Sequence, residues 1–355
     1  MPPRQIILLG LVLIVCLAGC GRSTSESTVT LRATATSVPP TATPDVPKPE
    51  GHLIILDTSD YPNHGIDRIN VATGESQRLF SAPEFSWIYQ LQVQADEQRV
   101  IFAYSPPPGD GRGLFDRSAV YALSLTDSSL EPEAVLGGNL PNEFYYEPTV
   151  SPDGRFMYYV RYAVDATSVI GAYQVLLERY DLALRERTTI TADGIWPQVS
   201  PDGENLIFIG VDPQTLQRGL YLTDLNGSQF QELIPLGRFF DIDVPHFSPD
   251  EKWIYVSVAE EPPQSSLLDW LLGVKPAYAH ADHNVPSDWW RISLLDGILE
   301  KITNEQLIIL SGDFSPDGQF LAFSTTTGLY IMQADGTNVT RLKEGQTFGT
   351  LRWVE

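Results

Sequence analysis

The sequence predicts an all-β fold assembled from repeated four-stranded units, and three observations lead to this prediction. A turn of the form Ser-Pro-Asp-Gly, followed by a short apolar strand, recurs along the chain. A second pattern, two strands joined by a Gly, Asp or Asn turn, alternates with it. The two patterns repeat at intervals of about fifty residues, the spacing of an array of small sheets.

The turn pattern occurs in four clear copies and one degenerate copy. The clear copies are VSPDGRFMYYV from Val150, VSPDGENLIFI from Val199, FSPDEKWIYVS from Phe247 and FSPDGQFLAFS from Phe314, and the degenerate copy is VQADEQRVIFA from Val93. In the full form the proline fixes φ, the aspartate bonds to its own backbone, and the glycine tolerates the conformation that ends the turn. The apolar residues that follow are typical of a short strand.

The hairpin pattern occurs six times. Three copies contain strong two-residue turns, at Asn226-Gly227, Asp296-Gly297 and Asp335-Gly336, and looser copies start at Gly65, Ala119 and Ala172. One turn pattern and one hairpin together make four antiparallel strands, which is one blade of a β-propeller.

Six hairpins against five turn patterns leave one blade incomplete, and the chain ends supply the missing strands. TLRWVE, from Thr350 to Glu355, matches the strand before a Ser-Pro-Asp turn, and HLIILDT, from His52, matches the strand after one. We therefore expect a six-bladed propeller whose sixth blade joins N- and C-terminal strands, which closes the ring and removes its open edge.

The repeats resemble those of the TolB-like and WD40-like propellers over nearly all of residues 51–355. The resemblance lies in the Pro-x-[Phe/Trp]-Ser-Pro-Asp-Gly turn followed by an Ile/Leu-Tyr hairpin with Asp and Gly in its turn. It implies the fold and no activity, because propellers host unrelated functions. TolB itself has an α/β domain before its propeller, whereas this sequence has about thirty residues there, so we expect a propeller protein other than TolB.

The first fifty residues are expected to be a signal and a tether. Residues 1–19 combine Arg4 with an apolar run that ends in Leu-Ala-Gly-Cys, which resembles the bacterial lipoprotein box and implies lipidation of Cys20. An ordinary secretory signal or an uncleaved anchor is the alternative. Residues 20–50 are rich in Ser, Thr and Pro, as in a disordered tether. Cys16 falls in the signal, so no disulfide is expected.

The net charge of the chain argues against some classes of binding partner. The formal net charge is −22, from 45 acidic and 23 basic residues. A field of this sign opposes nucleic acid and anionic lipid headgroups. No Gly-x-Ser-x-Gly motif is present in the sequence, so the oligopeptidase class, in which a propeller guards a hydrolase domain, is not supported. No catalytic residue and no cofactor are predicted.

Polar residues on the expected innermost strands form the candidate binding site. The densest group is DIDVPHFSPD, which precedes one of the turns. The candidates at the channel mouth are Gln92, Glu147, Trp196, Gln198, Asp241, Asp243, His246, Asp313 and Arg352. Such a set suits a polar ligand or a divalent cation. The alternative is that these groups bond to one another and to channel water.

An insertion at 262–287 lengthens the repeat whose turn starts at Phe247, and the strands of this repeat are expected at Pro245–Ser248, Trp253–Ala259, Asp288–Leu294 and Ile298–Thr303. Its segment SLLDWLLGV predicts a short amphipathic helix with an apolar cluster at Leu267, Leu268, Trp270, Leu271 and Leu272. The helix could pack on its own blade, dock a partner or rest in a lipid interface. His280, Asp282 and His283 are weak metal candidates, because a structural zinc site needs four ligands, and no metal site is predicted.

These observations favour a monomeric, lipid-anchored propeller in the bacterial cell envelope, on the extracytoplasmic face of a membrane. Its expected role is non-catalytic recognition of an envelope protein or an extracytoplasmic ligand. One alternative is an enzyme, a hydrolase or lyase with possible metal assistance, whose site lies at the channel. Another is a scaffold that holds an envelope complex together. Carboxylate pairs at the channel with strongly shifted pKa values would favour the enzyme.

Overall fold

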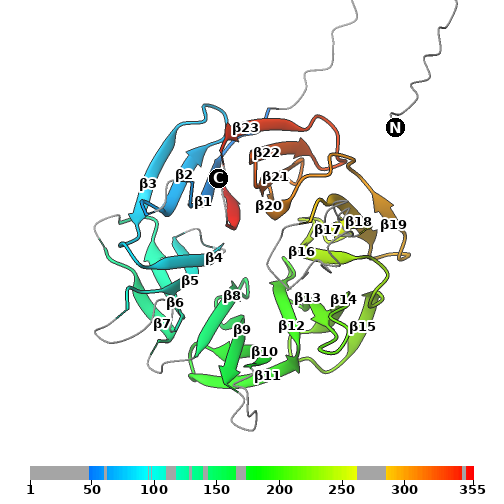
Figure 1. Cartoon of the computed structure of the whole chain (residues 1–355), viewed down its shortest axis with the longest axis horizontal. Coiled ribbons are helices and arrows are strands. Elements are labelled where there is room, and N and C mark those ends of the chain that lie inside the picture. The colour runs from blue at the N-terminus through cyan, green and yellow to red at the C-terminus, as the bar shows by residue number, and fades with distance from the viewer. Residues whose placement is uncertain are drawn as a thin grey trace, which may run out of the picture. The chain divides into compact units, whose positions relative to one another are not determined.

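Six four-stranded antiparallel sheets stand around a common axis in the computed structural model, which confirms the six-bladed β-propeller (Figure 1). The structure describes residues 48–59, 62–94, 96, 98–108, 117–127, 130–138, 143–164, 173–261, 285–345 and 349–355. We number the blades along the chain and give the strands of each from the axis outward.

The first three blades occupy the chain up to residue 234. Blade 1 comprises β4 (Trp87–Val93), β5 (Arg99–Ser105), β6 (Ala119–Ser124) and β7 (Glu133–Gly137). Blade 2 comprises β8 (Phe144–Val150), β9 (Phe156–Val164), β10 (Tyr173–Asp181) and β11 (Glu186–Ala192). Blade 3 comprises β12 (Gly194–Val199), β13 (Asn205–Val211), β14 (Arg218–Asp224) and β15 (Phe230–Ile234).

The remaining three blades include the one built from both ends of the ordered chain. Blade 4 comprises β16 (Asp241–Phe247), β17 (Trp253–Ala259), β18 (Asp288–Ser293) and β19 (Leu299–Lys301). Blade 5 comprises β20 (Ile309–Phe314), β21 (Phe320–Thr325), β22 (Gly328–Gln333) and β23 (Thr340–Glu344). Blade 6 comprises β24 (Leu351–Val354), β1 (His52–Asp57), β2 (Gly65–Asn70) and β3 (Ser76–Ser81).

Closure of the ring through both chain ends is confirmed. The innermost strand β24 pairs antiparallel with β1, from His52 opposite Val354 to Ile55 opposite Leu351. Figure 1 shows the red C-terminal strand beside the blue β1. The indole nitrogen of Trp353 also donates a hydrogen bond to the carbonyl oxygen of Glu50 at 2.9 Å. The ring is therefore fastened by strand pairing between residues about three hundred positions apart in the sequence.

Each Ser-Pro-Asp turn is held by the same side-chain hydrogen bonds. In all four copies the serine hydroxyl donates to the aspartate two residues later at 2.6–2.7 Å. The same hydroxyl oxygen accepts the backbone N–H five residues later, at 2.9–3.0 Å. The serine thus joins the turn to the start of the next strand, which explains why the tripeptide recurs.

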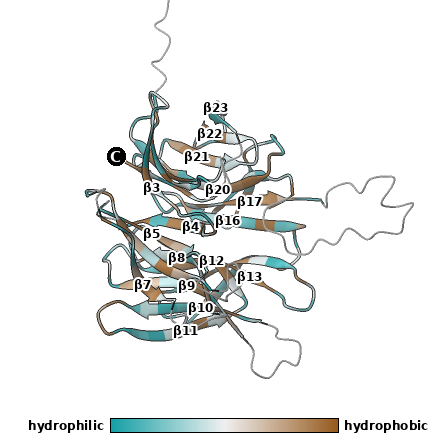
Figure 2. Ribbon diagram, turned by 60° about the vertical axis from the view of Figure 1, so that its left-hand side comes forward, coloured by the Kyte–Doolittle hydropathy of each residue, from teal (hydrophilic) through white to brown (hydrophobic). Residues whose placement is uncertain are grey.

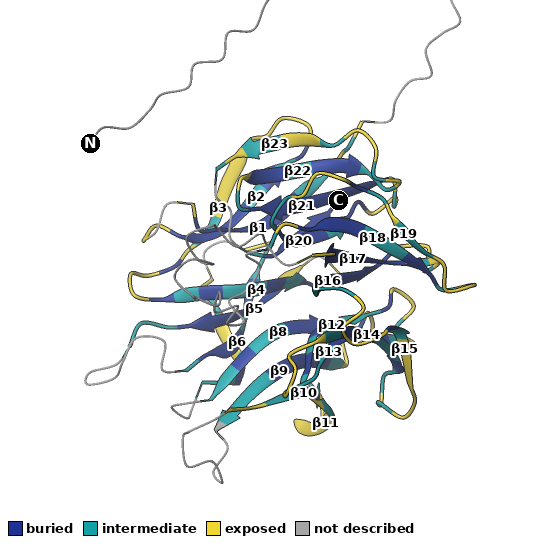
Figure 3. Cartoon of the chain, turned by 45° about the vertical axis from the view of Figure 1, so that its right-hand side comes forward, coloured by how far each residue is buried: buried dark blue, intermediate teal, exposed yellow. Residues whose placement is uncertain are grey.

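Burial decreases from the middle strands of each blade to the outer strand. The outer strands β3, β7, β11, β15 and β23 are largely exposed and appear yellow or teal where Figure 3 shows them, whereas central strands such as β17, β21 and β22 are dark blue. Many of their exposed residues are charged or polar, which discourages pairing of these edges with other chains. Successive residues of central strands such as β5, β17 and β21 are buried, so both faces of these blades are covered, and Figure 2 shows hydrophobic segments in brown along the strands.

Neighbouring blades pack face to face through apolar side chains. Leu53 and Ile55 of blade 6 share one buried cluster with Phe320 and Leu329 of blade 5. At Gly312 the packing is so close that a Cβ atom would come within 2.7 Å of the Trp289 ring, which requires glycine there. The core is therefore a series of blade-to-blade interfaces.

Several expectations fall outside the described residues. These are the signal, Cys20 and most of the tether, the insertion helix with its five apolar residues, and His280, Asp282 and His283. In the described part of the chain, no helix is long and apolar enough to cross a membrane. The innermost strand of blade 4 begins at Asp241 and not at the expected Pro245, because its pairing with β17 continues on both sides of a bulge.

Candidate functional site

A bulge interrupts the innermost strand of each of blades 1 to 5 a few residues before the turn that follows. In blades 2, 3 and 4 it places Glu147, Trp196 and Val244 at positive φ, between 53° and 55°. Side chains of this kind rarely adopt that conformation, and bulges re-aim the residues around them. Each inner strand is therefore divided into residues before the bulge and residues after it, and the two groups line different cavities.

The nine residues that the sequence grouped at one mouth are divided between the two ends of the ring. Gln92, Gln198, His246 and Asp313, which follow the bulges, line a cavity of about 390 Å³ beside the Ser-Pro-Asp turns, together with Arg352 of β24. Glu147, Trp196 and Asp243 line a cavity of about 900 Å³ nearer the start of the inner strands. Oδ1 of Asp241 lies 3.0 Å from Nη1 of Arg218, and Arg218 lines the larger cavity.

In the smaller cavity the polar groups bond to one another. The buried guanidinium of Arg352 donates to the side-chain oxygens of Gln92 and, at 3.5 Å, Gln198. Burial lowers the pKa of Arg352, and the negative charge of Asp313 offsets only part of this effect. Burial also raises the pKa of Asp313. Burial, with the charge of Arg352 as a second cause, holds the pKa of His246 well below its usual range. Arg352 therefore connects three blades.

Side chains at the bulges connect neighbouring blades in a way that the sequence did not predict. The backbone N–H of Trp196 in blade 3 donates to the carboxylate of Glu147 in blade 2, and the N–H of Glu147 donates to Gln90 Oε1 in blade 1 at 3.3 Å. The Thr350 hydroxyl accepts the N–H of Leu91 at 2.5 Å in the same manner. A bulge frees a backbone donor, and a polar side chain of the preceding blade accepts from it.

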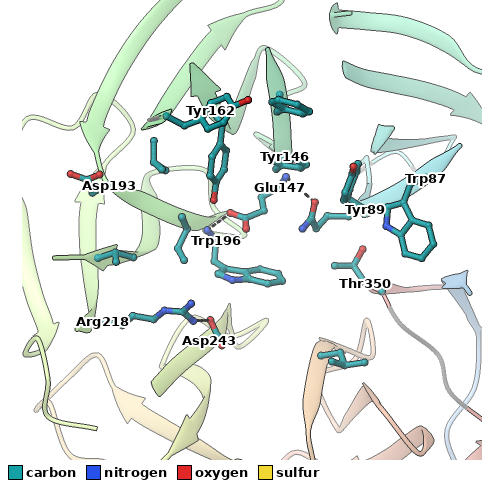
Figure 4. Close-up of a pocket in the computed structure, with 18 of the residues that line it drawn as sticks. Trp87, Tyr89, Tyr146, Glu147, Tyr162, Asp193, Trp196, Arg218, Asp243 and Thr350 are labelled. Carbon is teal, nitrogen blue, oxygen red and sulfur yellow. Dashed lines mark hydrogen bonds and ion pairs between the residues drawn. The ribbon is translucent and has the colours of Figure 1, made fainter. Parts of the chain in front are cut away.

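A continuous group of aromatic rings, which we call the aromatic wall, forms one side of the larger cavity. It consists of Tyr89, Phe144, Tyr146, Tyr162 and Tyr173. Ring centroids are 4.8 Å apart for Tyr89 and Tyr146, 5.2 Å for Tyr146 and Tyr162, and 5.8 Å for Phe144 and Tyr173. These three pairs meet edge to face, an arrangement that aromatic quadrupoles favour. Figure 4 shows Tyr89, Tyr146 and Tyr162 around the cavity, with Trp196 opposite.

The charged side chains of the larger cavity lie mainly across from the aromatic wall. Arg218 contacts Asp243, as drawn in Figure 4, and its pKa is raised: burial opposes its charge, but Asp243 and Asp241 outweigh that effect. Burial, with the charge of Asp212 as a second cause, raises the pKa of Asp193. Burial also raises the pKa values of the Tyr89 and Tyr146 phenols. The tyrosines therefore stay protonated at neutral pH.

Sequence reasoning missed the aromatic wall, although a signal was present. Tyr89, Phe144 and Tyr146 stand in the aromatic runs WIY and FYYEP of two inner strands. Tyr162 stands where the shorter β13 of blade 3 places Val211, which also lines the cavity, whereas Tyr173 reaches the cavity because β10 starts two residues before the position at which β14 starts in blade 3. The long hairpin could have been read from the wider spacing of the loose copy at Ala172.

No group of three or more His, Cys, Asp or Glu residues is placed to hold a metal ion in the part of the chain that the structure describes. The oxygen-rich sets that calcium and magnesium prefer would require such a group. The larger cavity instead combines several aromatic rings with a few fixed polar groups, a composition common in sites for organic ligands.

No family model and no curated protein matches the sequence. Among solved structures, TolB from Acinetobacter baumannii is similar with a TM-score of 0.61 at 19% identity, over 85% of this chain and 66% of that one. A putative TolB from Agrobacterium tumefaciens has a TM-score of 0.56 at 17% identity, over 86% and 99%. The fold is a TolB-like six-bladed β-propeller. A chain of a nidogen/laminin complex also matches, with a TM-score of 0.56 at 10% identity, over 84% and 97%.

For this TolB-like propeller, the likenesses establish the fold alone, because all three identities are below 20%. The chain spans 66% of the Acinetobacter protein. Function in a propeller depends on its own side chains and not on the fold. What the aromatic cavity of the TolB-like propeller can bind therefore depends on its own geometry and charge.

Proposed function

We propose that this protein is a non-catalytic binding propeller of the bacterial cell envelope, and that it takes its ligand in the aromatic cavity. The observation that carries the proposal is the cavity itself, about 900 Å³ in volume and lined by an aromatic wall and a few convergent polar groups. Cavities of this size and composition are the usual sites of organic ligands. The smaller cavity is a weaker candidate, because its polar groups already bond to one another.

The rim of the aromatic cavity supports this choice. The side chains of Tyr173 and Leu216 line the cavity and are 45% and 44% exposed. Large apolar side chains that remain exposed together beside a concave site are commonly covered when a ligand or partner binds. A ligand that enters from this face would bury both.

The chemistry of the cavity favours binding over turnover. Burial raises the pKa values of the Tyr89 and Tyr146 phenols, which makes these two side chains poor general bases at neutral pH. The carboxylate of Asp243 contacts Arg218, and that of Glu147 accepts a backbone hydrogen bond from Trp196. These groups act as fixed contacts for a ligand.

The envelope location rests on the N-terminal sequence. Residues 1–19 resemble a lipoprotein signal, and residues 20–50 have the composition of a tether. A lipid on Cys20 would anchor the protein to the membrane on its extracytoplasmic face. About thirty residues of this composition would then separate the lipid from the propeller, which could meet a ligand or an envelope protein.

Site-specific photo-crosslinking in intact cells tests the proposal. A benzoylphenylalanine placed at Tyr173 should give a defined adduct with a small molecule or partner under ultraviolet light. The matched control carries the same residue at Phe230, which is 49% exposed on the outer strand β15 and does not line the cavity. Adducts at Tyr173 alone support the proposal, whereas no adduct there, or the same adducts at both positions, would overturn it.

A further inference from the structure

The charges that line the aromatic cavity do not balance. Its lining residues include the carboxylates of Glu147, Asp193 and Asp243, and among these described lining residues Arg218 is the one cation. Arg218 contacts Asp243 and lies 3.0 Å from Asp241, so two carboxylates already oppose its charge. The cavity is therefore negative overall, within a chain whose formal net charge is −22.

The negative charge is held where water is partly excluded. Glu147 lies between the aromatic wall and Trp196 in Figure 4, and its carboxylate accepts the backbone N–H of Trp196. Burial raises the pKa of Asp193, which means that its negative charge is poorly solvated. A cation in the cavity would lower the electrostatic energy of both carboxylates, whereas a neutral ligand would not.

The aromatic wall adds a second preference for positive charge. The face of an aromatic ring carries partial negative charge and attracts cations, most strongly when the cation has lost its water. The five rings of the wall come from three strands of blade 2 and one of blade 1, and the indoles of Trp87 and Trp196 also line the cavity. Rings and carboxylates thus line one and the same cavity.

We propose that the ligand of the aromatic cavity is a small organic molecule with a quaternary ammonium group. This inference rests on the proposed function and specifies its ligand. A weakly hydrated ammonium can exchange water for ring faces, whereas a metal ion needs several oxygen ligands. The described residues hold no group of three acidic or His side chains that could supply them. A volume of about 900 Å³ fits a molecule larger than the ammonium group alone.

Choline and its neutral isostere 3,3-dimethylbutan-1-ol provide the direct test, since they share one shape and differ in charge. Their binding to the full-length protein is measured by isothermal titration calorimetry in a non-ionic detergent. We expect the dissociation constant of choline to be about tenfold lower or better, given the strength of a desolvated cation–π contact. Equal dissociation constants, or no measurable binding of choline, would overturn the ammonium assignment.

Two variants identify the groups responsible. Glu147→Gln removes the charge but keeps an oxygen that can accept the Trp196 N–H, and we expect it to weaken choline binding about tenfold while leaving the neutral isostere unchanged. Tyr162→Leu keeps an apolar side chain but removes a ring of the aromatic wall. We expect it too to weaken choline binding about tenfold and to leave binding of the neutral isostere unchanged. Unchanged choline affinity in both variants would contradict the assignment.

The matched controls are Glu186→Gln, which makes the same change of charge at an exposed site on β11, and Phe230→Leu, which removes an exposed ring from β15. Both should bind choline like the parent. If Glu186→Gln weakened binding as much as Glu147→Gln, the effect would be one of net charge and the assignment would fail. The crosslinking test is independent of ligand charge, so failure of the ammonium assignment is distinguishable from failure of the binding proposal.

Discussion

At the scale of single residues, the serine of each Ser-Pro-Asp turn has two hydrogen-bond partners and is buried. Ser315 is 3% exposed, donates to Asp317 at 2.6 Å and accepts from the Phe320 N–H at 3.0 Å. Removal of the hydroxyl leaves a buried backbone donor without its acceptor, which is costly. The repeat is therefore conserved within this chain for a local physical reason.

We expect Ser315→Ala to lower the free energy of unfolding by about 1–3 kcal/mol, measured by urea denaturation. Thr189→Ala, which removes an exposed hydroxyl from β11, is the control and should change it by less than about 0.5 kcal/mol. The degenerate turn offers the reverse test. Gln94→Ser would restore the missing hydroxyl next to Asp96 and should stabilise the protein by about 0.5–1.5 kcal/mol. Equal stability of Ser315→Ala and the parent would contradict the assigned role.

The turn aspartates also predict how stability depends on pH. The Lys252 ammonium and the Ser248 hydroxyl beside Asp250 lower the pKa of its carboxyl to about 2. A carboxyl with a depressed folded-state pKa contributes stability above its unfolded-state pKa, near 4, and this contribution is lost as the pH falls toward 2. Asp250 is largely exposed, so the contribution is about 0.5 kcal/mol.

Thermal unfolding of Asp250→Asn and the parent at several pH values measures this contribution. The variant should be slightly less stable than the parent at pH 7, and the difference should shrink between pH 4 and pH 2. A constant difference over that range would show that the charge of Asp250 plays no part.

At the scale of elements, the bulged inner strands explain both the blade contacts and the division of the polar residues. The bulges of blades 2 and 3 each expose a backbone N–H, which Gln90 or Glu147 of the preceding blade accepts, and Thr350 accepts the N–H of Leu91 just after the bulge of blade 1. Trp196 and Val244 occupy the same position in blades 3 and 4, and their side chains have no acceptor to offer. The side chains at these two positions therefore cannot make the same contact with the next blade.

Glu147 accordingly has a structural role that can be separated from ligand binding. We expect Glu147→Leu to lower the free energy of unfolding by about 1–3 kcal/mol, because the Trp196 N–H loses its acceptor. Glu147→Gln retains an acceptor oxygen and should stay within about 0.5 kcal/mol of the parent. Chemical denaturation measures the free energy of unfolding of both variants. An equal loss of this free energy in both would show that the carboxylate charge, and not its acceptor oxygen, stabilises the ring.

At the scale of the whole molecule, the ring depends on six residues at the C-terminus. The strand β24 buries Leu351, Trp353 and Val354 and pairs with β1. Deletion of residues 350–355 should lower the unfolding free energy by several kcal/mol, since each buried apolar side chain contributes roughly 1.5–3 kcal/mol and the edge of β1 becomes exposed. Calorimetry measures the loss, with deletion of the exposed Glu355 alone as the control. A truncated protein that melts within a degree or two of the parent would contradict closure by β24.

Anchoring is likewise a property of the whole chain. If Cys20 carries the lipid, metabolic labelling with a fatty acid should mark the protein, and Cys20→Ser should abolish the label. Cys16→Ser is the control, because Cys16 lies inside the signal that would be removed. A label that persists in Cys20→Ser would refute the anchor.

The sequence alone determined the class of fold, the number of blades and the closure of the ring. Turn chemistry and the two-residue strand period are local properties, so each repeat can be recognised without its neighbours. Six hairpin patterns against five turn patterns then predicted that the segments at His52 and Thr350 belong to one blade. The pairing of β1 with β24 confirmed this prediction.

Only the tertiary structure decided which side chains meet. The nine polar candidates occupy similar places in their repeats, but the bulges at Glu147, Trp196 and Val244 send residues on either side of them to opposite ends of the ring. The aromatic wall joins Tyr89 to Tyr146 and Tyr162, from two blades and three strands. Such proximity depends on the packing of blades, and no periodicity within one repeat encodes it.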